Sequence, residues 1–174
     1  MNKKICIIST VDLTLSQFVL PSAREMKRRG FEVTLVSSMS SAFRAKFQDE
    51  FHLVDIQMAR GVKLFGMIKG IISFYKLFKN NNFDIIQYAT PNASFYASLA
   101  GTLAGVPKRL YCQWGIRYVG LEGISRKVFK TIEKITCYFS TDIRPASHKN
   151  MEFAISEKLY ERKKSKVVGY GGAV

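Results

Sequence analysis

Short apolar runs alternate with amphipathic stretches along the whole chain. The runs are rich in β-branched residues, and they predict strands at 5–9, 31–37, 51–58, 84–88, 109–112, 142–145 and 166–168. The stretches between them predict one helix from Phe18 to Arg29 and others at 41–47, 63–79, 92–104, 125–139 and 147–155. Strands that alternate with helices indicate a parallel sheet covered on both faces. We therefore expect an α/β fold with a mostly parallel sheet of about six to seven strands.

Local signals set several of these boundaries. Pro21 is tolerated only near the first turn of a helix, so the first helix is expected to begin close to Phe18. Gly30 and Gly105 are stop signals for the helices before them, and Ser147 is a candidate N-cap. A length of 174 residues and a hydrophobic content of 47% fit one folded domain, which we expect to be Rossmann-like.

The segment that follows the strand at 109–112 carries the most informative side chains. Trp114 offers a flat apolar face, and Arg117 offers a planar fork of donors. Gln113 both donates and accepts hydrogen bonds, and Tyr118 ends the segment. Ligands of open parallel sheets bind at the loops that leave the carboxyl ends of the strands. The segment therefore predicts a site for a polar, anionic ligand; the alternative is a packed aromatic ring and a solvated charge.

Other loops at the same predicted edge add weaker candidates. Thr10 and Asp12 follow the first strand and suit sugar hydroxyls, or else they only form a turn and cap a helix. Asn92 follows the strand at 84–88 with the same two readings, and His148 follows another strand at this edge. The first loop lacks the GxGxxG pattern, so a dinucleotide fingerprint is missing.

The charge of the chain is strongly unbalanced. Its 27 Lys and Arg residues against 13 Asp and Glu residues give a formal net charge of +14 and favour an anionic partner. No helix-turn-helix, zinc-finger or RNP-type pattern is present, so we expect no nucleic acid partner. The predicted helix at 63–79 is apolar around most of its circumference, with Lys69, Lys76 and Lys79 on one strip. This pattern predicts contact with an anionic membrane surface; the alternative is a deeply buried helix or one covered by a partner domain.

The three cysteines are scattered along the sequence. Cys6, Cys112 and Cys137 show no spacing that suggests zinc, so no metal site is predicted. We interpret them as reduced thiols of a cytoplasmic protein. No segment reaches the roughly 18 uninterrupted apolar residues of a membrane span.

Several of these segments together resemble the amino-terminal half of a GT-B-fold glycosyltransferase of family 4. The resemblance covers essentially the whole chain and is carried by 4–10, Phe18, Pro21, 30–36, 83–87, 105–107, 111–120 and 167–171. The most similar subgroup comprises bacterial enzymes that build capsule, exopolysaccharide or lipid-linked glycans. Each piece alone is weak, and it is their order and spacing that make the match specific.

The resemblance implies two Rossmann-like domains with the active site between them. Residues 1–168 would form the amino-terminal, acceptor-binding domain, and 169–174 would begin the linker to an absent carboxyl-terminal donor domain. The full-length enzyme would transfer a hexose from a nucleotide sugar, of the UDP-sugar kind, without a metal or other cofactor in this domain. The acceptor would be a glycan linked to polyprenyl diphosphate, at the inner face of the cytoplasmic membrane. The isolated domain would be inactive.

The sequence also departs from the pattern of this family. The first loop, at 10–16, has no glycine, and Trp114 precedes Gly115 where many members carry His-Gly or His-Asp. Gln87 and Tyr88 stand where many members carry a histidine, so no catalytic residue can be assigned. The alternative function is a non-enzymatic, membrane- or partner-binding subunit of a split transferase. The acceptor-site candidates are Thr10, Asp12, Asn92, Gln113, Trp114, Arg117, Tyr118 and His148.

Overall fold

The computed structural model describes residues 3–58 and 64–169, and its six strands form one sheet. The strands are β1 (Lys4–Val11), β2 (Glu32–Ser38), β3 (His52–Asp55), β4 (Ile85–Tyr88), β5 (Lys108–Gln113) and β6 (Asp142–Pro145). Their order is β3-β2-β1-β4-β5-β6, and every neighbouring pair is parallel. The predicted fold class is therefore confirmed, with a sheet that is parallel throughout.

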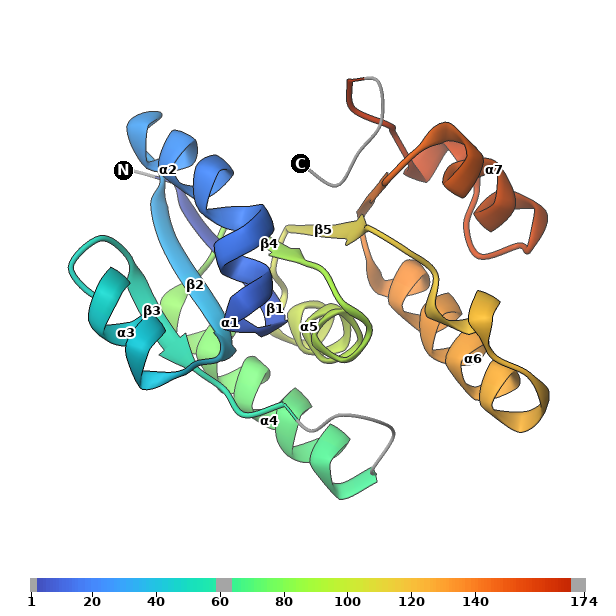
Figure 1. The fold of residues 1–174 in the computed structure, drawn as a ribbon, viewed down its shortest axis with the longest axis horizontal. Helices are drawn as coiled ribbons and strands as arrows, with labels where there is room; N and C mark the ends of the chain where they lie inside the picture. Colours follow the sequence, from blue (N-terminus) through green and yellow to red (C-terminus); the bar gives the residue numbers. More distant parts are fainter. Residues whose placement is uncertain (1–2, 59–63, 170–174) are drawn as a thin grey trace.

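Helices cover both faces of this sheet (Figure 1). They are α1 (Asp12–Thr14), η1 (Leu15–Val19), α2 (Leu20–Arg28), α3 (Ser41–Phe47), α4 (Leu64–Asn81), α5 (Pro91–Ala104), η2 (Arg117–Gly120), α6 (Gly123–Phe139), α7 (His148–Ser156) and η3 (Arg162–Lys164). The segment from α1 to α3 packs on one face, and α4, α5 and α6 pack on the other. Successive strand residues point to opposite faces, so β1 contributes Ile5 and Ile7 to one core and Cys6 and Ile8 to the other.

The helix α5 lies closest to the sheet. Its small residues Ala93, Ala97, Ala100 and Gly101 are fully buried, and a Cβ atom added to Gly101 would overlap the Cδ1 atom of Ile86. On its outer side, α5 packs against α4, where an added Cβ at Gly70 would lie 2.9 Å from the ring of Tyr96. This close stacking of strand and two helices sets the position of the amino-terminal end of α5 at the edge of the sheet.

The predicted start of the first helix and the predicted last strand are wrong. The first helical segment begins at Asp12 rather than near Phe18. Within it, η1 is a π-helical turn in which the Leu20 N–H donates to the Leu15 oxygen. This wider turn accommodates Pro21, which lacks an N–H and falls at the start of α2. The predicted strand at 166–168 is absent: Ser165 forms one isolated parallel bridge with Ile143, and the chain then leaves the sheet.

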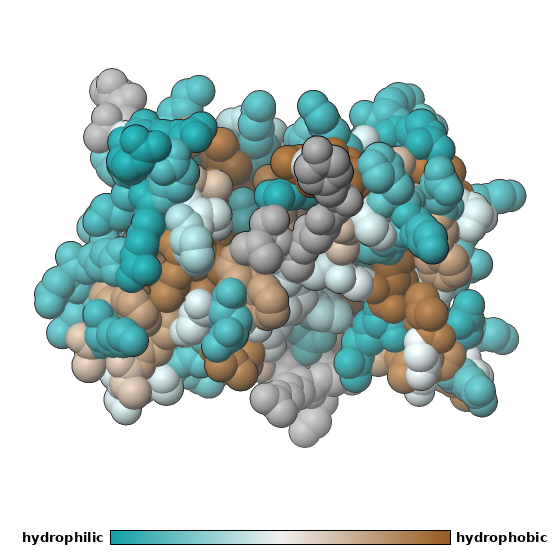
Figure 2. Space-filling model, turned by 45° about the horizontal axis from the view of Figure 1, so that its top comes forward, coloured by the Kyte–Doolittle hydropathy of each residue, from teal (hydrophilic) through white to brown (hydrophobic). Residues whose placement is uncertain are grey.

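The remaining elements agree closely with the prediction. The strand predicted at 51–58 is shorter, and Ser40 and Ser147 cap α3 and α7 by accepting hydrogen bonds from the helix backbone. Lys63 and residues 170–174 of the predicted linker lie outside the described residues. Polar side chains cover most of the face in Figure 2, and hydrophobic ones appear between them in separate patches.

Candidate functional site

The strand order reverses direction between β1 and β4. To one side of this point the chain progresses through β2 and β3, and to the other side through β5 and β6. The crevice outside the carboxyl ends of strands at such a switch point is the usual ligand site of an open parallel sheet. Thr10 at the end of β1 and Thr90 just after β4 meet across it, with their hydroxyl oxygens 2.7 Å apart.

One pocket of about 450 Å³ lies at one end of α6, and a second of about 410 Å³ lies beside the switch point. The second, here called the Trp114 pocket, is lined by Thr90, Pro91, Tyr111, Cys112, Trp114, Gly115, Ile116 and Arg117. Its lining comes from the segment after β4, from the end of β5 and from the loop after β5. The two strands are neighbours, with Tyr88 beside Tyr111 in the sheet. Its position therefore agrees with the site predicted from the sequence.

The two side chains that dominated the sequence prediction both line this pocket. The Trp114 ring is half-buried and packs 5.6 Å, centroid to centroid, from the ring of Phe18 in η1. The Arg117 side chain is exposed, and its guanidinium carbon lies 5.1 Å above the ring of Phe129. The site thus combines a held aromatic face with a cation that remains open to solvent.

The chemistry of the lining suits binding rather than proton transfer. Arg117 is the one charged side chain among the described lining residues, and none of these is a carboxylate or an imidazole. Burial raises the pKa of the Cys112 thiol to about 12 and that of the Tyr111 hydroxyl well above its usual value, so both stay neutral. The pocket therefore fits a neutral or anionic ligand with an apolar face, such as a sugar that carries a phosphate.

Thr90 lines the pocket although it is not among the site residues predicted from the sequence. It adopts a φ of 70°, which is rare for a β-branched residue, in the N-cap position of α5. Its side chain caps no helical amide; its oxygen instead accepts from the Thr10 backbone N–H at 3.0 Å and contacts the oxygen of Ala89. The signal in the sequence was the following Pro91, which forces the preceding residue out of the helical region.

The other predicted candidates lie at different distances from this pocket. Thr10 adjoins it through Thr90, and Asn92 is half-buried in the first turn of α5. His148 is exposed at the start of α7 and is not among the lining residues. Asp12 faces α3: its carboxylate accepts from the Ser40 backbone N–H at 2.7 Å and from the Ser40 hydroxyl at 2.6 Å. Partial burial acts to raise the pKa of Asp12, but these hydrogen bonds outweigh it and lower the pKa.

Gln113 and Tyr118 are buried instead of facing the pocket. The Gln113 side chain donates to Glu133 at 2.6 Å and accepts from the Tyr160 hydroxyl at 3.0 Å. The Tyr118 hydroxyl donates to Glu157 at 3.1 Å, and burial raises its pKa. Both side chains are therefore engaged within the fold and are not available to a ligand in the Trp114 pocket.

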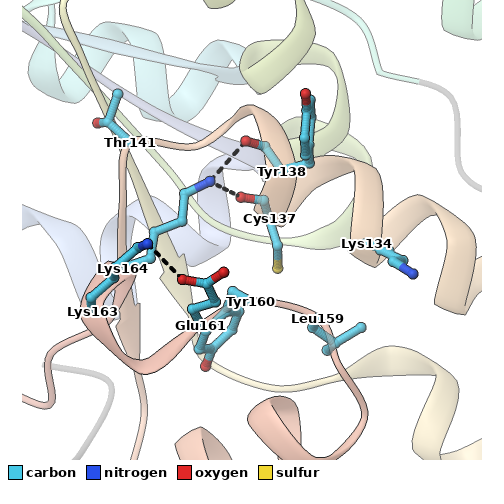
Figure 3. A pocket seen from close by; sticks show the side chains of 9 residues that line it. All are labelled: Lys134, Cys137, Tyr138, Thr141, Leu159, Tyr160, Glu161, Lys163 and Lys164. Carbon is cyan, nitrogen blue, oxygen red and sulfur yellow. Dashed lines mark hydrogen bonds and ion pairs between the residues drawn. The ribbon is translucent and has the colours of Figure 1, made fainter.

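Two of the three lysines that line the pocket at the end of α6, Lys163 and Lys164, have partners within the protein (Figure 3). The Lys164 ammonium donates to the backbone oxygens of Cys137 at 2.7 Å and Tyr138 at 2.8 Å, where it caps the helix. Lys163 pairs with Glu161 at 2.7 Å. Most of the positive charge of this pocket thus has internal partners, which favours the Trp114 pocket as the functional site.

No group of three or more His, Cys, Asp or Glu side chains at residues 3–58 and 64–169 is placed to hold a metal ion. Among the helices in these ranges, none combines the length and the apolar character needed to cross a bilayer.

Comparison with known proteins gives a family and a fold. The sequence model of the "Glycosyl transferase 4-like" family matches residues 4–147. The capsular polysaccharide biosynthesis glycosyltransferase CapM of Staphylococcus aureus is 25% identical over 99% of this chain and 44% of its own length. An Escherichia coli UDP-Gal:alpha-D-GlcNAc-diphosphoundecaprenol alpha-1,3-galactosyltransferase is 24% identical over 81% of this chain and 37% of its own length. The chain thus spans less than half the length of these curated relatives.

Solved structures share the fold at lower identity. A putative UDP-N-acetylglucosamine 2-epimerase from Listeria monocytogenes superposes with a TM-score of 0.74 at 16% identity, over 98% of this chain and 46% of that one. A glycosyltransferase from Rickettsia africae gives 0.70 at 14% identity, over 96% and 42%. MurG from Acinetobacter baumannii gives 0.61 at 14% identity, over 98% and 46%. In each case the chain corresponds to a little under half of the larger protein.

Proposed function

Because the chain belongs to the glycosyl transferase 4-like family, we propose that it is the acceptor-binding lobe of a glycosyltransferase that builds capsular or lipid-linked glycans. The observation that carries the proposal is the Trp114 pocket at the switch point of the sheet. A sugar ring of the acceptor would stack on Trp114, and its phosphate would pair with Arg117.

The reaction that we propose is transfer of a hexose from a UDP-sugar to a glycan linked to polyprenyl diphosphate. The name of the E. coli relative specifies a donor and an acceptor of these two kinds. The donor would bind to a second lobe, in keeping with the share of the relatives that this chain covers. The Trp114 pocket has no proton-transfer group among its described lining residues, so the groups that assist the chemistry would come from outside this pocket.

A membrane-bound acceptor also requires that the lobe reach the bilayer, and α4 has a suitable surface. Gly70, Phe74 and Phe78 face the core, whereas Phe65, Ile68, Ile72 and Tyr75, here called the α4 stripe, are 89%, 48%, 48% and 38% exposed. Lys69, Lys76 and Lys79 are exposed on the same helix. We propose that the α4 stripe lies in the interface of an anionic membrane, with the lysines at the lipid phosphates, so that the protein is peripheral to the cytoplasmic face.

The experiment that tests the acceptor site measures binding of GlcNAc diphosphate carrying a short prenyl chain. Replacing Arg117 with Ala removes the charged partner of the diphosphate, and we expect the dissociation constant to rise about 10- to 100-fold. Trp114→Ala removes the stacking face and is expected to weaken binding as well.

Matched controls are available away from the pocket. Tyr138→Ala removes an aromatic ring that is 75% exposed at the end of α6, and Arg162→Ala removes a guanidinium in η3. Both controls should bind the acceptor as the unchanged protein does. If the Trp114 and Arg117 variants bind no differently from these controls, the proposed acceptor site is wrong.

A further inference from the structure

A carboxylate is buried directly beneath the Trp114 pocket. Glu133 of α6 is only 4% exposed, and its oxygens accept from the Tyr111 hydroxyl at 3.0 and 3.1 Å and from the Gln113 amide at 2.6 Å. No Lys or Arg among the described residues forms an ion pair with it. A carboxylate held in the interior by neutral partners alone is costly, so its contacts point to a role beyond packing.

Both partners of Glu133 belong to the strand that ends in the pocket. Tyr111 lines the Trp114 pocket itself, and Gln113 is the residue immediately before Trp114. Gln113 is held at every polar group of its side chain: the amide nitrogen donates to Glu133 and the amide oxygen accepts from Tyr160. Its backbone oxygen accepts from the Asn150 side chain and from the Ala146 N–H, each at 3.0 Å.

We propose that Glu133 is a positioning residue of the Trp114 pocket, whose carboxylate fixes the end of β5 through Tyr111 and Gln113 and makes the loop at Trp114 sensitive to pH. The biological meaning of this role rests on the proposed function, whereas the contacts of Glu133 that support it are independent of that function. The network of Glu133, Gln113, Tyr111 and Tyr160 extends from the Trp114 pocket to the pocket in Figure 3, where Tyr160 and Cys137 form part of the wall.

The surroundings of Glu133 make it the member of this network that changes charge near neutrality. Burial raises its pKa to about 7, against hydrogen bonds from Gln113 and Tyr111 that act to lower it. The titratable groups that face it are Tyr111 from β5, Cys137 from α6 and Tyr160 after α7, and burial raises the pKa of each. The charge of Glu133 also acts on Tyr118 in η2, and the Lys164 ammonium acts on the neighbouring Cys137.

Ionisation changes what Glu133 offers its partners. The carboxylate accepts charge-assisted hydrogen bonds from Tyr111 and Gln113, which are stronger than neutral ones. The protonated acid must donate its own proton, so one of the two partners turns away or accepts instead. The hold on the end of β5 is therefore tightest above the pKa of Glu133 and loosens below it.

The protein carries its own probe for this change. Trp114 is the single tryptophan of the chain, so its fluorescence and its quenching by acrylamide report on the pocket loop alone. Quenching is measured between about pH 5 and 8. We expect it to decrease with rising pH, with a midpoint near the pKa of Glu133, about 7. In Glu133→Gln this transition should be lost. A transition that persists in Glu133→Gln, or its absence from the unchanged protein, would overturn the proposal.

Control variants separate this effect from general titration and from unfolding. Two variants should keep the transition: Glu157→Gln and His148→Asn. The first removes a carboxylate that is bonded to Tyr118 and Lys130. If circular dichroism shows that Glu133→Gln does not fold, Tyr160→Phe decides: it frees the Gln113 oxygen and should raise quenching at every pH. Unchanged quenching there would refute the proposal. A failure of acceptor binding leaves this readout intact, so the two proposals fail separately.

Discussion

At the scale of single residues, the side chains near the end of β5 divide between the two faces of the sheet. Tyr111 and Gln113 reach Glu133 in α6, while Trp114 packs on Phe18 on the opposite side. This division follows from the period of two along a strand. Residue types at a strand end predicted Trp114 and Arg117 as ligand contacts, and both line the Trp114 pocket. The alternation that turns Gln113 inward becomes visible only when the strand is placed between its helices.

Glu133 also makes the stability of the protein depend on pH. Its folded pKa, about 7, lies above the ordinary value of 4.5, so the folded state binds its proton more tightly than the unfolded chain does. The stabilisation is complete below 4.5 and is lost as the pH rises to about 7. We expect a loss on the order of 3 kcal/mol in the free energy of unfolding over this window.

Urea unfolding of the unchanged protein and of Glu133→Gln, at a series of pH values, measures this effect. The difference between their free energies of unfolding should change between pH 4.5 and about pH 7 and stay constant at higher pH. The exposed carboxylates of Glu25 and Glu50 have lowered pKa values because Arg28, Arg29 and Arg24 donate to them, so their contributions are lost at lower pH. Parallel curves for the two proteins would contradict the assignment.

At the scale of elements, periodicity and stop signals predicted most helices and strands, and packing explains the exceptions. The pattern of apolar residues could not reveal the π-helical turn of η1, because a wide turn alters hydrogen bonding without altering composition. The predicted strand at 166–168 has the β-branched residues of a strand, but its pairing with β6 is limited to the bridge at Ser165 and the Lys166 N–H, which donates to the Ile143 oxygen. For α4, the broad apolar surface gave the correct helix but could not tell which side faces the core.

The contact between α5 and β4 gives a prediction at this scale. Gly101→Ala should gain about 1 kcal/mol of helix propensity but lose about 1–3 kcal/mol through overlap with the buried Ile86 side chain. We therefore expect a net destabilisation of about 1 kcal/mol in denaturant unfolding.

A second substitution tests whether overlap with Ile86 causes the destabilisation by Gly101→Ala. In an Ile86→Val background the overlapping Cδ1 atom is gone, and Gly101→Ala should then be neutral or stabilising. Gly120→Ala is the matched control, because a Cβ there meets nothing within 4 Å. If Gly101→Ala stabilises the unchanged protein, the helix and strand are less closely packed than the structure indicates.

At the scale of the whole molecule, the net charge of +14 and the α4 stripe bear on where the protein acts. We expect it to sediment with vesicles that contain anionic lipid and to remain in solution with neutral vesicles or at high salt. Replacing Lys69 and Lys76 with Gln removes about 1 kcal/mol for each lysine and should weaken sedimentation about 30-fold.

A second pair of substitutions controls for net charge. Lys163 and Lys166 are exposed near the end of the chain, away from α4, so replacing both with Gln removes the same charge. The two double variants should differ clearly. Equal weakening by both would show a diffuse charge effect instead of a surface on α4, and a lack of sedimentation in the unchanged protein would favour a protein partner for the α4 stripe.

The π-helical turn between Asp12 and Leu20 has an evolutionary consequence. It contains one residue more than an α-helix needs, and Phe18, the partner of the Trp114 ring, lies within it. Deleting one residue there would restore a regular helix and swing the aromatic neighbour by about 100° around the axis. Homologues can therefore change what packs against the Trp114 ring by gaining or losing a single codon, while every strand of the sheet keeps its register.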